Sequence, residues 1–513
     1  MKKFTFILAF FKYLRFNRKF LKSKNVEYEN IILNEVSDLR SFSLSSSYFA
    51  KTLSNKYKSR VISYYFWIFD FKDYINILIK LLNPFSNFYV YKSFSNKILF
   101  PFYFQKLKSK KNQIFKSKKD LLNLKYNNII IGDLIYDDFL ARNKLATIDI
   151  NSYKFIFFLN RYFKIIEYWN SFIKTNKVSA IIISHSVYCM GLLGRIGLSK
   201  KVPVYVISPI SHYKLTKKNY IKWSDQNRYP YLFKTFNENI KKKILLDSKY
   251  NLSNRLSGKK DFRYNISNPI KPVFTGKKIF KKKSNNDIFK VLIASHCFSD
   301  APHVYGKLLF SDFFEWLQFL GKLTNHKKTS NYIWYIKPHP AFYNLEHNIY
   351  EKLVIKYPKM KLLNPEITHN ETINNFKIEG ILTVFGSVGH EFPLFNIPVI
   401  NAGNNPHSGY DFNLNPKNLK EYKRLILNFK NIKIKKNVQK KIYEFYGMHH
   451  LIDYSFFSNF LDNINEKIGF DSFQIYYEFI KKINLEIHFS KINIYNKFIN
   501  GKNRRLIDLN KFN

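Results

Sequence analysis

Residues 380–412 constrain the fold of this chain more than any other segment. They read GILTVFGSVGHEFPLFNIPVINAGNNPHSGYDF. The apolar run Ile381–Val384 predicts a buried strand, and the small residues Gly386–Gly389 predict a tight turn into a helix. A second apolar run, Ile397–Ile400, predicts the next strand. This order is typical of a parallel α/β sheet, in which ligands bind at the carboxyl ends of the strands.

The turn in this segment has the composition of a phosphate site. Gly386 and Gly389 allow the backbone to approach a ligand, and the free N–H groups of the next helix would face an anion. Glu391, one turn later, is a candidate for holding ribose hydroxyls. The plain alternatives are that any tight turn needs small residues and that a helix start favours a carboxylate.

A second candidate region lies upstream in the run WYIKPHP. Lys337 and His339 follow a predicted strand at 332–336 and offer a cation and an imidazole. Taken with the glycine turn, they predict a nucleotide-sugar site. Taken alone, the tetrapeptide KPHP also fits a loop with a hydrogen-bonded histidine.

The charge of the chain indicates an anionic partner. Its 513 residues carry a formal net charge of +49, and 46% of them are hydrophobic, which excludes a disordered protein. Lysine is spread along the chain, and no helix-turn-helix, RNP motif or zinc spacing is present. We therefore do not expect nucleic acid as a partner, and an anionic membrane surface explains the charge better. The plain alternative is compositional drift towards lysine.

Cysteine usage and the first residues bear on the compartment. The two cysteines, Cys189 and Cys297, predict no disulfide framework and no metal site, which fits a reducing cytoplasm. The start, MKKFTFILAFFKYLRF, predicts a basic amphipathic helix or strand instead of a signal peptide. No run reaches the roughly 18 apolar residues that span a bilayer. We expect a cytoplasmic protein, peripheral at the inner face of the cytoplasmic membrane.

Apolar runs alternate with helical patterns along the whole chain, which predicts an α/β fold. Strands are predicted at 30–33, 60–65, 88–91, 128–132, 178–184, 202–208, 290–294 and 361–363, besides those named above, and helices at 152–174, 188–199, 311–323, 346–356, 415–430 and 438–445. The predicted domains are an N-terminal Rossmann-like domain (1–255), a linker (256–289), a C-terminal Rossmann-like domain (290–450) and a helical extension that packs back (451–513).

Several segments resemble GT-B glycosyltransferases of bacterial capsule and surface polysaccharide biosynthesis. They are Ile129–Ala141, Ala180–Gly197, Ala294–Leu317, Tyr335–Pro340 and Thr383–Gly403. The resemblance implies two Rossmann-like domains facing a cleft, with the acceptor in the first and the nucleotide-sugar donor in the second.

Two motifs bear on the donor. The pair His339-Pro340 and a downstream serine resemble transferases that use CMP-sugars such as Kdo or sialic acid, which implies that His339 and Ser387 contact the donor phosphate. The sequence GSVGHE replaces the Ser-Ser pair of those enzymes. Its SxGxE shape also resembles UDP-sugar transferases and hydrolysing UDP-GlcNAc 2-epimerases, in which the glutamate (here Glu391) holds ribose. The nucleobase therefore stays open.

Asp133 and His185 are the candidate catalytic residues. Both follow apolar runs, so we expect both at the carboxyl ends of strands, facing the cleft. A histidine takes a hydroxyl proton near neutral pH, and an aspartate acts as a base or as a nucleophile in a double displacement. The plain alternatives are a capping histidine and a helix N-cap aspartate. We favour Asp133.

Further polar residues follow predicted strands and are expected to contact substrate. They are His296, Ser299, Asp300 and His303 after the strand at 290–294, and Asn404 and His407 after the last core strand. Their spacing fits no zinc pattern and their carboxylates are few, so no metal and no cofactor are expected.

The sequence thus predicts a glycosyltransferase that moves a sugar from a nucleotide-sugar, CMP-linked by preference, to a glycan or lipid-linked glycan acceptor. One alternative is a hydrolysing UDP-GlcNAc 2-epimerase or a UDP-sugar transferase. Another is a non-catalytic glycan- or membrane-binding assembly protein, which would tolerate changes of Lys337, His339 and Glu391.

Overall fold

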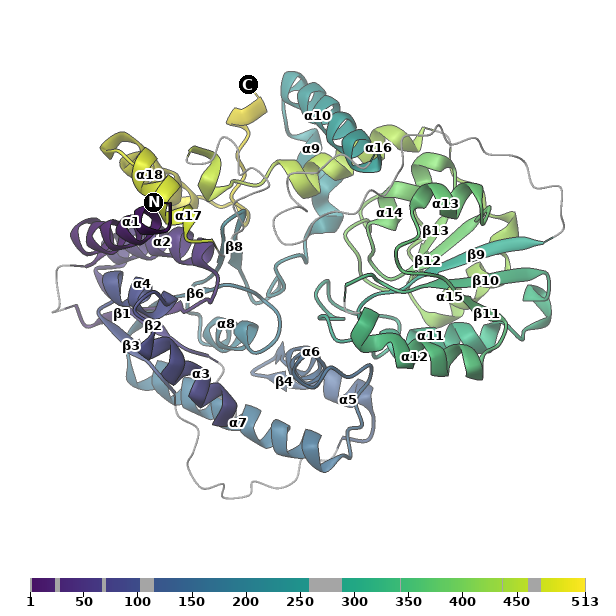
Figure 1. Cartoon of the computed structure of the whole chain (residues 1–513), viewed down its shortest axis with the longest axis horizontal. Coiled ribbons are helices and arrows are strands. Elements are labelled where there is room, and N and C mark those ends of the chain that lie inside the picture. The colour runs from purple at the N-terminus through teal and green to yellow at the C-terminus, as the bar shows by residue number, and fades with distance from the viewer. Residues whose placement is uncertain are drawn as a thin grey trace. The chain divides into compact units, whose positions relative to one another are not determined.

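The chain forms two compact units, each built around its own sheet (Figure 1). The computed structural model describes residues 2–23, 28–66, 71–101, 115–257, 288–341, 343–435, 437–459 and 472–512. The N-terminal unit comprises residues 1–135, 150–222 and 453–508. The C-terminal unit comprises residues 136–149, 223–452 and 509–513.

The N-terminal unit contains a six-stranded sheet in the order β3-β2-β1-β6-β7-β8. Its strands are β1 (Asn30–Glu35), β2 (Ser59–Tyr64), β3 (Lys97–Leu99), β6 (Val178–Ile183), β7 (Val204–Ser208) and β8 (Ser211–Leu215). All neighbours pair in parallel except β7 and β8. The chain builds outwards from β1 in one direction and then from β6 in the other, so the two strands flank a topological switch point.

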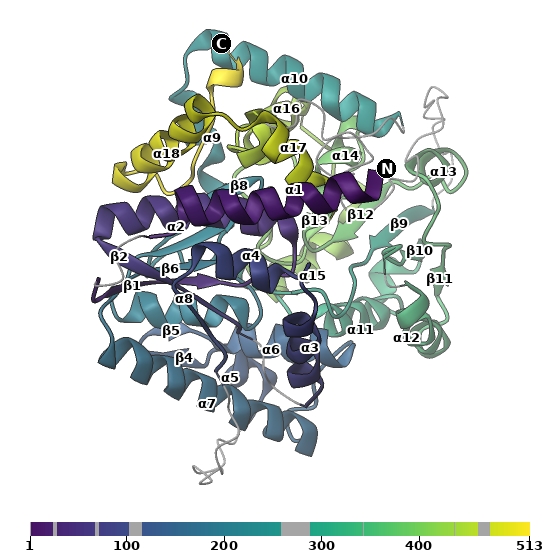
Figure 2. The same cartoon turned by 60° about the vertical axis from the view of Figure 1, so that its left-hand side comes forward.

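Helices cover both faces of this sheet (Figure 2). One face packs in a common core with α1 (Lys2–Phe16), α2 (Arg40–Tyr57), α4 (Asn87–Phe94), α17 (Gln474–Lys482) and α18 (Leu485–Asn500). The other carries α7 (Tyr153–Thr175) and α8 (Met190–Ser199). Helix α8 approaches closely, because a Cβ on Gly197 would lie 2.4 Å from Cδ1 of Ile181.

The remaining elements of this part of the chain lie around the sheet. They are α3 (Phe71–Leu82), α5 (Lys118–Leu122), the hairpin of β4 (Lys125–Tyr126) and β5 (Ile129–Ile130), and the start of α6 (Gly132–Asn143). None of the helices that the structure describes is both long and apolar enough to cross a membrane.

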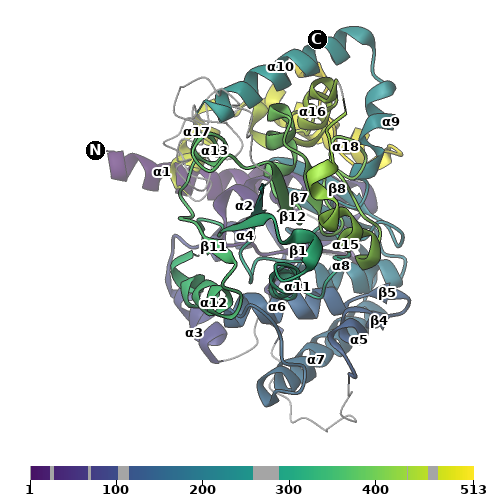
Figure 3. The same cartoon turned by 90° about the vertical axis from the view of Figure 1, so that its right-hand side faces the viewer.

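The C-terminal unit (Figure 3) contains a five-stranded, fully parallel sheet in the order β11-β10-β9-β12-β13, which can be followed in Figure 1. Its strands are β9 (Phe289–Ala294), β10 (Tyr332–Lys337), β11 (Met360–Leu362), β12 (Gly380–Thr383) and β13 (Val399–Asn401). The chain again reverses its direction of growth, here between β9 and β12. The carboxyl ends of these two strands therefore flank the switch point of this sheet.

Helices also cover both faces of the second sheet. One core contains α11 (Phe313–Leu323), α12 (Tyr343–Lys356) and α15 (Leu419–Leu427), and the opposite core contains residues of α13 (His369–Asn374). The other helices of this unit are α9 (Tyr229–Lys234), α10 (Glu238–Leu256), α14 (Val388–Glu391) and α16 (Val438–Tyr446).

The α/β class with two Rossmann-like sheets is confirmed, but two predicted strands are wrong. Residues 88–91 belong to helix α4, because Val90, Tyr91 and Phe94 are all buried at helical spacing. The strand predicted at 128–132 shrinks to the two residues of β5, which pair with β4 in an antiparallel hairpin outside the main sheet. Asn127 and Asn128 both have positive φ, 45° and 68°, which forms the tight turn.

The contacts group the ends of the chain differently from the predicted domain boundaries. Residues 453–459 and 472–508 belong to the N-terminal unit, and residues 136–149 and 223–257 belong to the C-terminal unit. Of the predicted linker 256–289, residues 258–287 lie outside the described part.

Replacing Phe479 by alanine tests the assignment of the C-terminal helices to the N-terminal unit. Its ring is 1% exposed and contacts Tyr13, Phe16 and Tyr48. We expect the free energy of unfolding to fall by about 3–5 kcal/mol in denaturant titrations. The matched control is Phe489→Ala, at a side chain that is 57% exposed on α18, where a change within about 0.5 kcal/mol is expected. If Phe479→Ala lowered the free energy of unfolding no more than Phe489→Ala does, the packing of α17 in the N-terminal unit would be contradicted.

Candidate functional site

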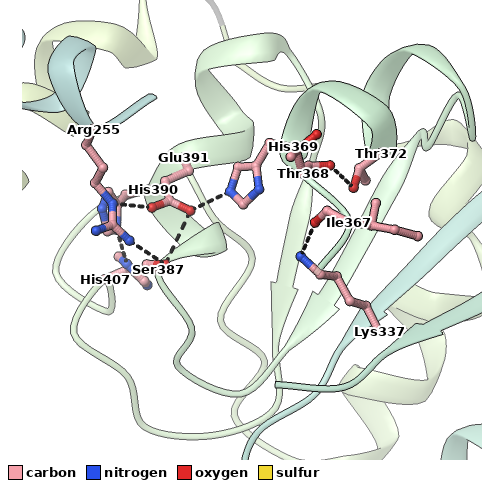
Figure 4. Close-up of polar contacts among 10 residues, drawn as sticks. All are labelled: Arg255, Lys337, Ile367, Thr368, His369, Thr372, Ser387, His390, Glu391 and His407. Atoms are coloured by element: carbon pink, nitrogen blue, oxygen red, sulfur yellow. Dashed lines mark hydrogen bonds and ion pairs between the residues drawn. The ribbon is translucent and has the colours of Figure 1, made fainter. Parts of the chain in front are cut away.

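A buried carboxylate, Glu391, organises the end of β12 in the C-terminal unit (Figure 4). The side chain is 1% exposed. Its Oε1 accepts a hydrogen bond from Nε of Arg255 at 2.7 Å, and its Oε2 accepts from Nε2 of His369 at 2.7 Å and from the hydroxyl of Ser387 at 3.2 Å. All of these partners come from the C-terminal unit.

The electrostatics of this cluster follow from burial. Burial alone would raise the pKa of Glu391, but the charge of Arg255 and the hydrogen bond from His369 hold the pKa well below its ordinary value. Burial lowers the pKa of His369 against the charge of Glu391, and its Nε2 donates a hydrogen bond to the carboxylate. The carboxylate of Glu391 is therefore ionised, and both of its oxygens accept hydrogen bonds.

Three separate helices bring these side chains together. Arg255 lies in the last turn of α10, and Glu391 ends the four-residue helix α14. His369 opens α13, where a capping box between Thr368 and Glu371 fixes the start of the helix. Because Glu391 already has partners for both oxygens, the structure gives it a role in positioning Arg255, and the predicted contact with ribose is not tested.

Lys337 is the last residue of β10, and His339 follows the strand. Nζ of Lys337 donates to the carbonyl of Ile367 at 2.6 Å. Burial lowers the pKa of this amine, and the charges of Glu391 and Glu371 partly offset the effect. Glu391 thus binds the guanidinium of Arg255 directly and acts on the amine of Lys337 through its charge alone.

His339 is exposed and its tautomer is defined by its neighbours. Its Nδ1 accepts the backbone N–H of Ala341 at 3.2 Å and lies 3.3 Å from Sγ of Cys297. In the neutral ring the proton is therefore on Nε2, which makes no hydrogen bond within the described part of the chain. Nε2–H is thus a donor available to a ligand.

The two glycines of the turn, Gly386 and Gly389, lie in close contact with neighbouring side chains. Ser387 lies 3.4 Å from Nη2 of Arg255, next to the cationic groups. A Cβ at Gly386 would lie 2.9 Å from Oγ1 of Thr383, and one at Gly389 would lie 2.5 Å from the ring of His407. Gly389 is thus needed for the packing of the buried His407, and the predicted contact of the turn with phosphate is not tested.

His296 links the ends of β9 and β12 at the switch point of this sheet. It follows β9, and its Nε2 lies 3.2 Å from Oγ1 of Thr383 and accepts the backbone N–H of Val384 at 3.3 Å. The ring packs on Phe313 and Phe385, with centroids 4.8 and 4.4 Å apart. Burial lowers the pKa of His296 to about 3, so it is neutral and serves as an acceptor. These bonds join the ends of β9 and β12.

The other predicted substrate residues of this unit differ in access. Ser299 and His407 are buried, whereas Asp300 and Asn404 are exposed. His303 is buried and pairs with Asp137 of α6, whose carboxylate lies 2.6 Å from Nδ1 and also accepts the backbone N–H of His303 at 3.0 Å. Sequence reasoning missed Asp137, because it lies in the helical run after Asp133 with no motif of its own.

The N-terminal unit has a different polar cluster at its switch point. Glu35 ends β1, and Ser184 and His185 directly follow β6. The backbone N–H and the hydroxyl of Ser184 donate to the Glu35 carboxylate at 2.9 and 2.7 Å. The same hydroxyl lies 2.9 Å from Nδ1 of His185. A continuous chain of hydrogen bonds therefore joins a buried carboxyl group to the imidazole.

The two ends of this chain differ in burial. Glu35 is 3% exposed, and burial raises the pKa of its carboxyl group to about 8 against the hydrogen bonds from Ser184. The ring of His185 reaches solvent and stacks on Phe42 with centroids 5.3 Å apart, but burial of the imidazole, with the charge of Lys222, lowers its pKa to about 4, which keeps the ring neutral. Its Nε2 makes no hydrogen bond within the described residues, so it is available to a substrate.

Asp133 occupies a different environment from the one predicted. It lies in the first turn of α6, after the β4–β5 hairpin, and not at the end of a strand of the parallel sheet. Arg195 of α8 binds both carboxylate oxygens, with Nη2 to Oδ2 at 2.8 Å, and also donates to the carbonyl of Ile130 at 2.6 Å. Asp133 therefore follows β5 of the hairpin, and the expectation that it lies at the carboxyl end of a strand of the parallel sheet is wrong.

The sequence carried a signal for one of the missed residues. Glu35 is the only acid in the run NIILNE, and an acid at the end of an apolar strand indicates a buried functional group. Arg255 lies in a polar, lysine-rich helix and has no such signal. Among the described residues, no group of three or more His, Cys, Asp and Glu side chains is placed to hold a metal ion.

Comparisons with known proteins give only distant likenesses. No family model matches the chain, and no curated protein matches it. Among solved structures, it is similar to the Thermosulfurimonas dismutans KpsC beta-Kdo 2,4 transferase, with 12% identity over 53% of this chain and 79% of that chain and a TM-score of 0.32. It is also similar to the UDP-GlcNAc 2-epimerase of Neisseria meningitidis, with 10% identity over 82% and 96% and a TM-score of 0.23. At these values the likenesses do not bear on the activity of this chain.

Arg255→Ala tests the central role of the ion pair. Removing the guanidinium leaves a buried carboxylate without its main counter-charge, and we expect the free energy of unfolding to fall by about 3–5 kcal/mol. Because the folded pKa of Glu391 is depressed, its contribution in the wild type is present above pH 4.5 and is lost as the pH falls through the folded pKa. Denaturant titrations at several pH values measure both effects.

The matched control for this variant is Arg424→Ala, at an exposed arginine of α15 in the same unit. A change within about 0.5 kcal/mol is expected there. A loss for Arg255→Ala no larger than that of the control would contradict the ion-pair account.

Proposed function

We propose that this protein is a glycosyltransferase that moves a sugar from a nucleotide-sugar donor to a hydroxyl group of a glycan acceptor. One observation carries the proposal: both sheets have the same kind of switch point, and each switch point holds a polar cluster suited to one half of this reaction. The cluster of the C-terminal unit contains the paired guanidinium of Arg255 and, near it, the amine of Lys337. The cluster of the N-terminal unit ends in an available imidazole.

The C-terminal unit suits the phosphate of the donor. Nucleotides bind at the switch points of parallel α/β sheets, where strand ends and helix starts converge. Arg255, Lys337 and Nε2–H of His339 supply positive charge and a hydrogen-bond donor there. In the reaction, the bond between the anomeric carbon and the phosphate oxygen breaks, and these groups stabilise the negative charge on the departing nucleotide. Glu391 holds Arg255 in place.

The N-terminal unit suits the activation of the acceptor. In the proposed step, Nε2 of His185 takes the proton of the attacking hydroxyl, and the acceptor oxygen forms the new bond to the anomeric carbon. The Nδ1 proton passes to the hydroxyl of Ser184, whose own proton passes to Glu35. The raised pKa of Glu35 makes this carboxylate a good final proton acceptor. We assign the base to His185 and not to Asp133, because Arg195 occupies both oxygens of Asp133.

The CMP-linked donor rests on the His339-Pro340 pair and its resemblance to CMP-sugar transferases. A UDP-sugar remains the main alternative, because the SxGxE shape of residues 387–391 is shared with UDP-sugar enzymes. We propose a surface glycan as the acceptor from the same resemblance.

A thermal-shift panel of CMP, CDP, UMP, UDP and GDP tests the donor site. A ligand that binds only the folded protein at a hundred times its Kd stabilises it by about 2.7 kcal/mol. We expect CMP to raise the melting temperature of the wild type, and His339→Ala and Lys337→Met to reduce that shift. The matched control is His347→Ala, on the partly exposed α12 residue, which should keep the full shift.

Each result of the panel has a defined meaning. Stabilisation by UDP alone would move the donor to a UDP-sugar and would admit the hydrolysing epimerase. Absence of any shift at millimolar nucleotide would contradict the proposed function.

The pH dependence of transfer tests the histidine relay. Glu35 must be ionised to receive the proton, so kcat should rise with pH through about 8 and fall as the carboxyl group becomes protonated below it. His185→Ala and Glu35→Gln should each lower kcat about 100-fold or more while leaving the nucleotide-induced thermal shift unchanged. In the Glu35→Gln variant, the rise of kcat with pH near pH 8 should also disappear.

Asp133→Asn provides the contrasting result in the same assay. If that variant, shown to be folded by circular dichroism, abolished transfer while His185→Ala retained it, the base would be Asp133 and the relay assignment would be wrong.

A further inference from the structure

Helix α1 presents apolar side chains on two faces. One face is packed in the core of the N-terminal unit, where Phe10 and Tyr13 are fully buried. The other face is exposed at four positions spaced by three, one and three residues: Phe4 (73%), Ile7 (39%), Leu8 (47%) and Phe11 (48%). This spacing places them in one stripe along the helix.

Helix α3 repeats the pattern. Its inner side contributes Ile77, which is 3% exposed, to the same core. Its outer side exposes Ile75 (40%), Leu78 (40%), Ile79 (57%) and Leu82 (83%), at the same helical spacing as the stripe on α1. An amphipathic helix of a globular domain normally places charged residues on its outer face. Helices α1 and α3 therefore depart from the usual pattern in the same way.

The two helices that carry these stripes are linked through α4 and through the segment between α3 and α4. Helix α4 contacts both α1 and α3. The ring of Phe85, between α3 and α4, contacts the exposed Phe11 with centroids 5.9 Å apart. We name the surface formed by the eight exposed residues of α1 and α3 the apolar helix pair.

Basic residues accompany this surface. The segment 2–21, which covers α1 and the turn after it, contains no aspartate or glutamate. Lys12 and Arg15 of α1 and Lys72 of α3 are exposed beside the stripes. The apolar helix pair thus combines exposed apolar side chains with positive charge, in a chain whose formal net charge is +49.

We propose that the apolar helix pair binds the surface of a bilayer that contains anionic phospholipids. Interfacial helices of this composition bury their apolar face about 5–10 Å into the boundary between headgroups and acyl chains. Neighbouring Lys and Arg side chains then contact the lipid phosphates. A second copy of the chain is a poorer partner, because a two-fold interface would bring the same basic residues of both copies together. This surface does not depend on the proposed chemistry.

Co-sedimentation of the full chain with vesicles tests the proposal. Vesicles of phosphatidylglycerol and phosphatidylcholine in equal parts should bind the protein, and vesicles of phosphatidylcholine alone should bind it more weakly. Raising the salt concentration should reduce binding to the anionic vesicles, because it screens the lysine and arginine charges. The double variants Phe4→Glu with Leu8→Glu, and Leu78→Glu with Leu82→Glu, should each lower the partition coefficient at least about tenfold.

The matched control is the double variant Tyr153→Glu with Phe157→Glu. These two side chains lie on α7 of the same unit and are 83% and 39% exposed, so the control adds the same charge at exposed aromatic positions elsewhere. It should bind vesicles as the wild type does. Thermal melting checks that all variants remain folded.

Three results would overturn the proposal. The wild type could fail to bind anionic vesicles, or the α7 control could lose as much binding as the α1 and α3 variants. Alternatively, the wild type could form a dimer in light scattering that the α1 and α3 variants dissociate, which would assign this surface to a second copy of the chain.

Discussion

The C-terminal unit depends on the neutralisation of one buried carboxylate. An ionised carboxyl group with 1% exposure is stable only with a counter-charge and full hydrogen bonding, and Glu391 obtains both from Arg255, His369 and Ser387. These bonds join α10, α13 and the turn after β12. The same pairing fixes the guanidinium of Arg255 at the carboxyl edge of the sheet. The stability of this region and the position of its main cation are thus consequences of one interaction.

The buried carboxyl group of the N-terminal unit, Glu35, is stabilised in a different way. Glu35 has no cationic partner among its hydrogen bonds, only the amide and hydroxyl of Ser184, and its pKa is raised to about 8. A paired carboxylate with a depressed pKa holds charge permanently, whereas one with a raised pKa can exchange a proton near neutral pH. The first suits an anion site built from fixed charges, and the second suits acid–base chemistry. This difference is the physical basis for giving the two units different parts of one reaction.

The sequence predicted the parallel sheets well because apolar runs such as Ile381–Val384, placed between helical patterns, favour buried strands. It failed where burial on several sides removes periodicity, as in α4, whose Val90, Tyr91 and Phe94 favour a strand by residue type alone. The position of Glu391 could be predicted, but its partner Arg255 could not. A contact between residues 136 positions apart depends on tertiary packing, and nothing in the polar helix α10 distinguishes that arginine. The exposed apolar stripes of α1 and α3 could not be predicted either, because the sequence alone does not show which apolar face of a helix is buried and which is exposed.

Crystal structures of the protein soaked with CMP and with UDP test the central claim, which is that the cluster around Glu391 is a nucleotide phosphate site. The account predicts phosphate density within hydrogen-bonding distance of Arg255 and of Lys337 or His339, with the Arg255–Glu391 pair kept. A nucleotide bound elsewhere, or an unoccupied cluster at nucleotide concentrations that stabilise the protein, would contradict it.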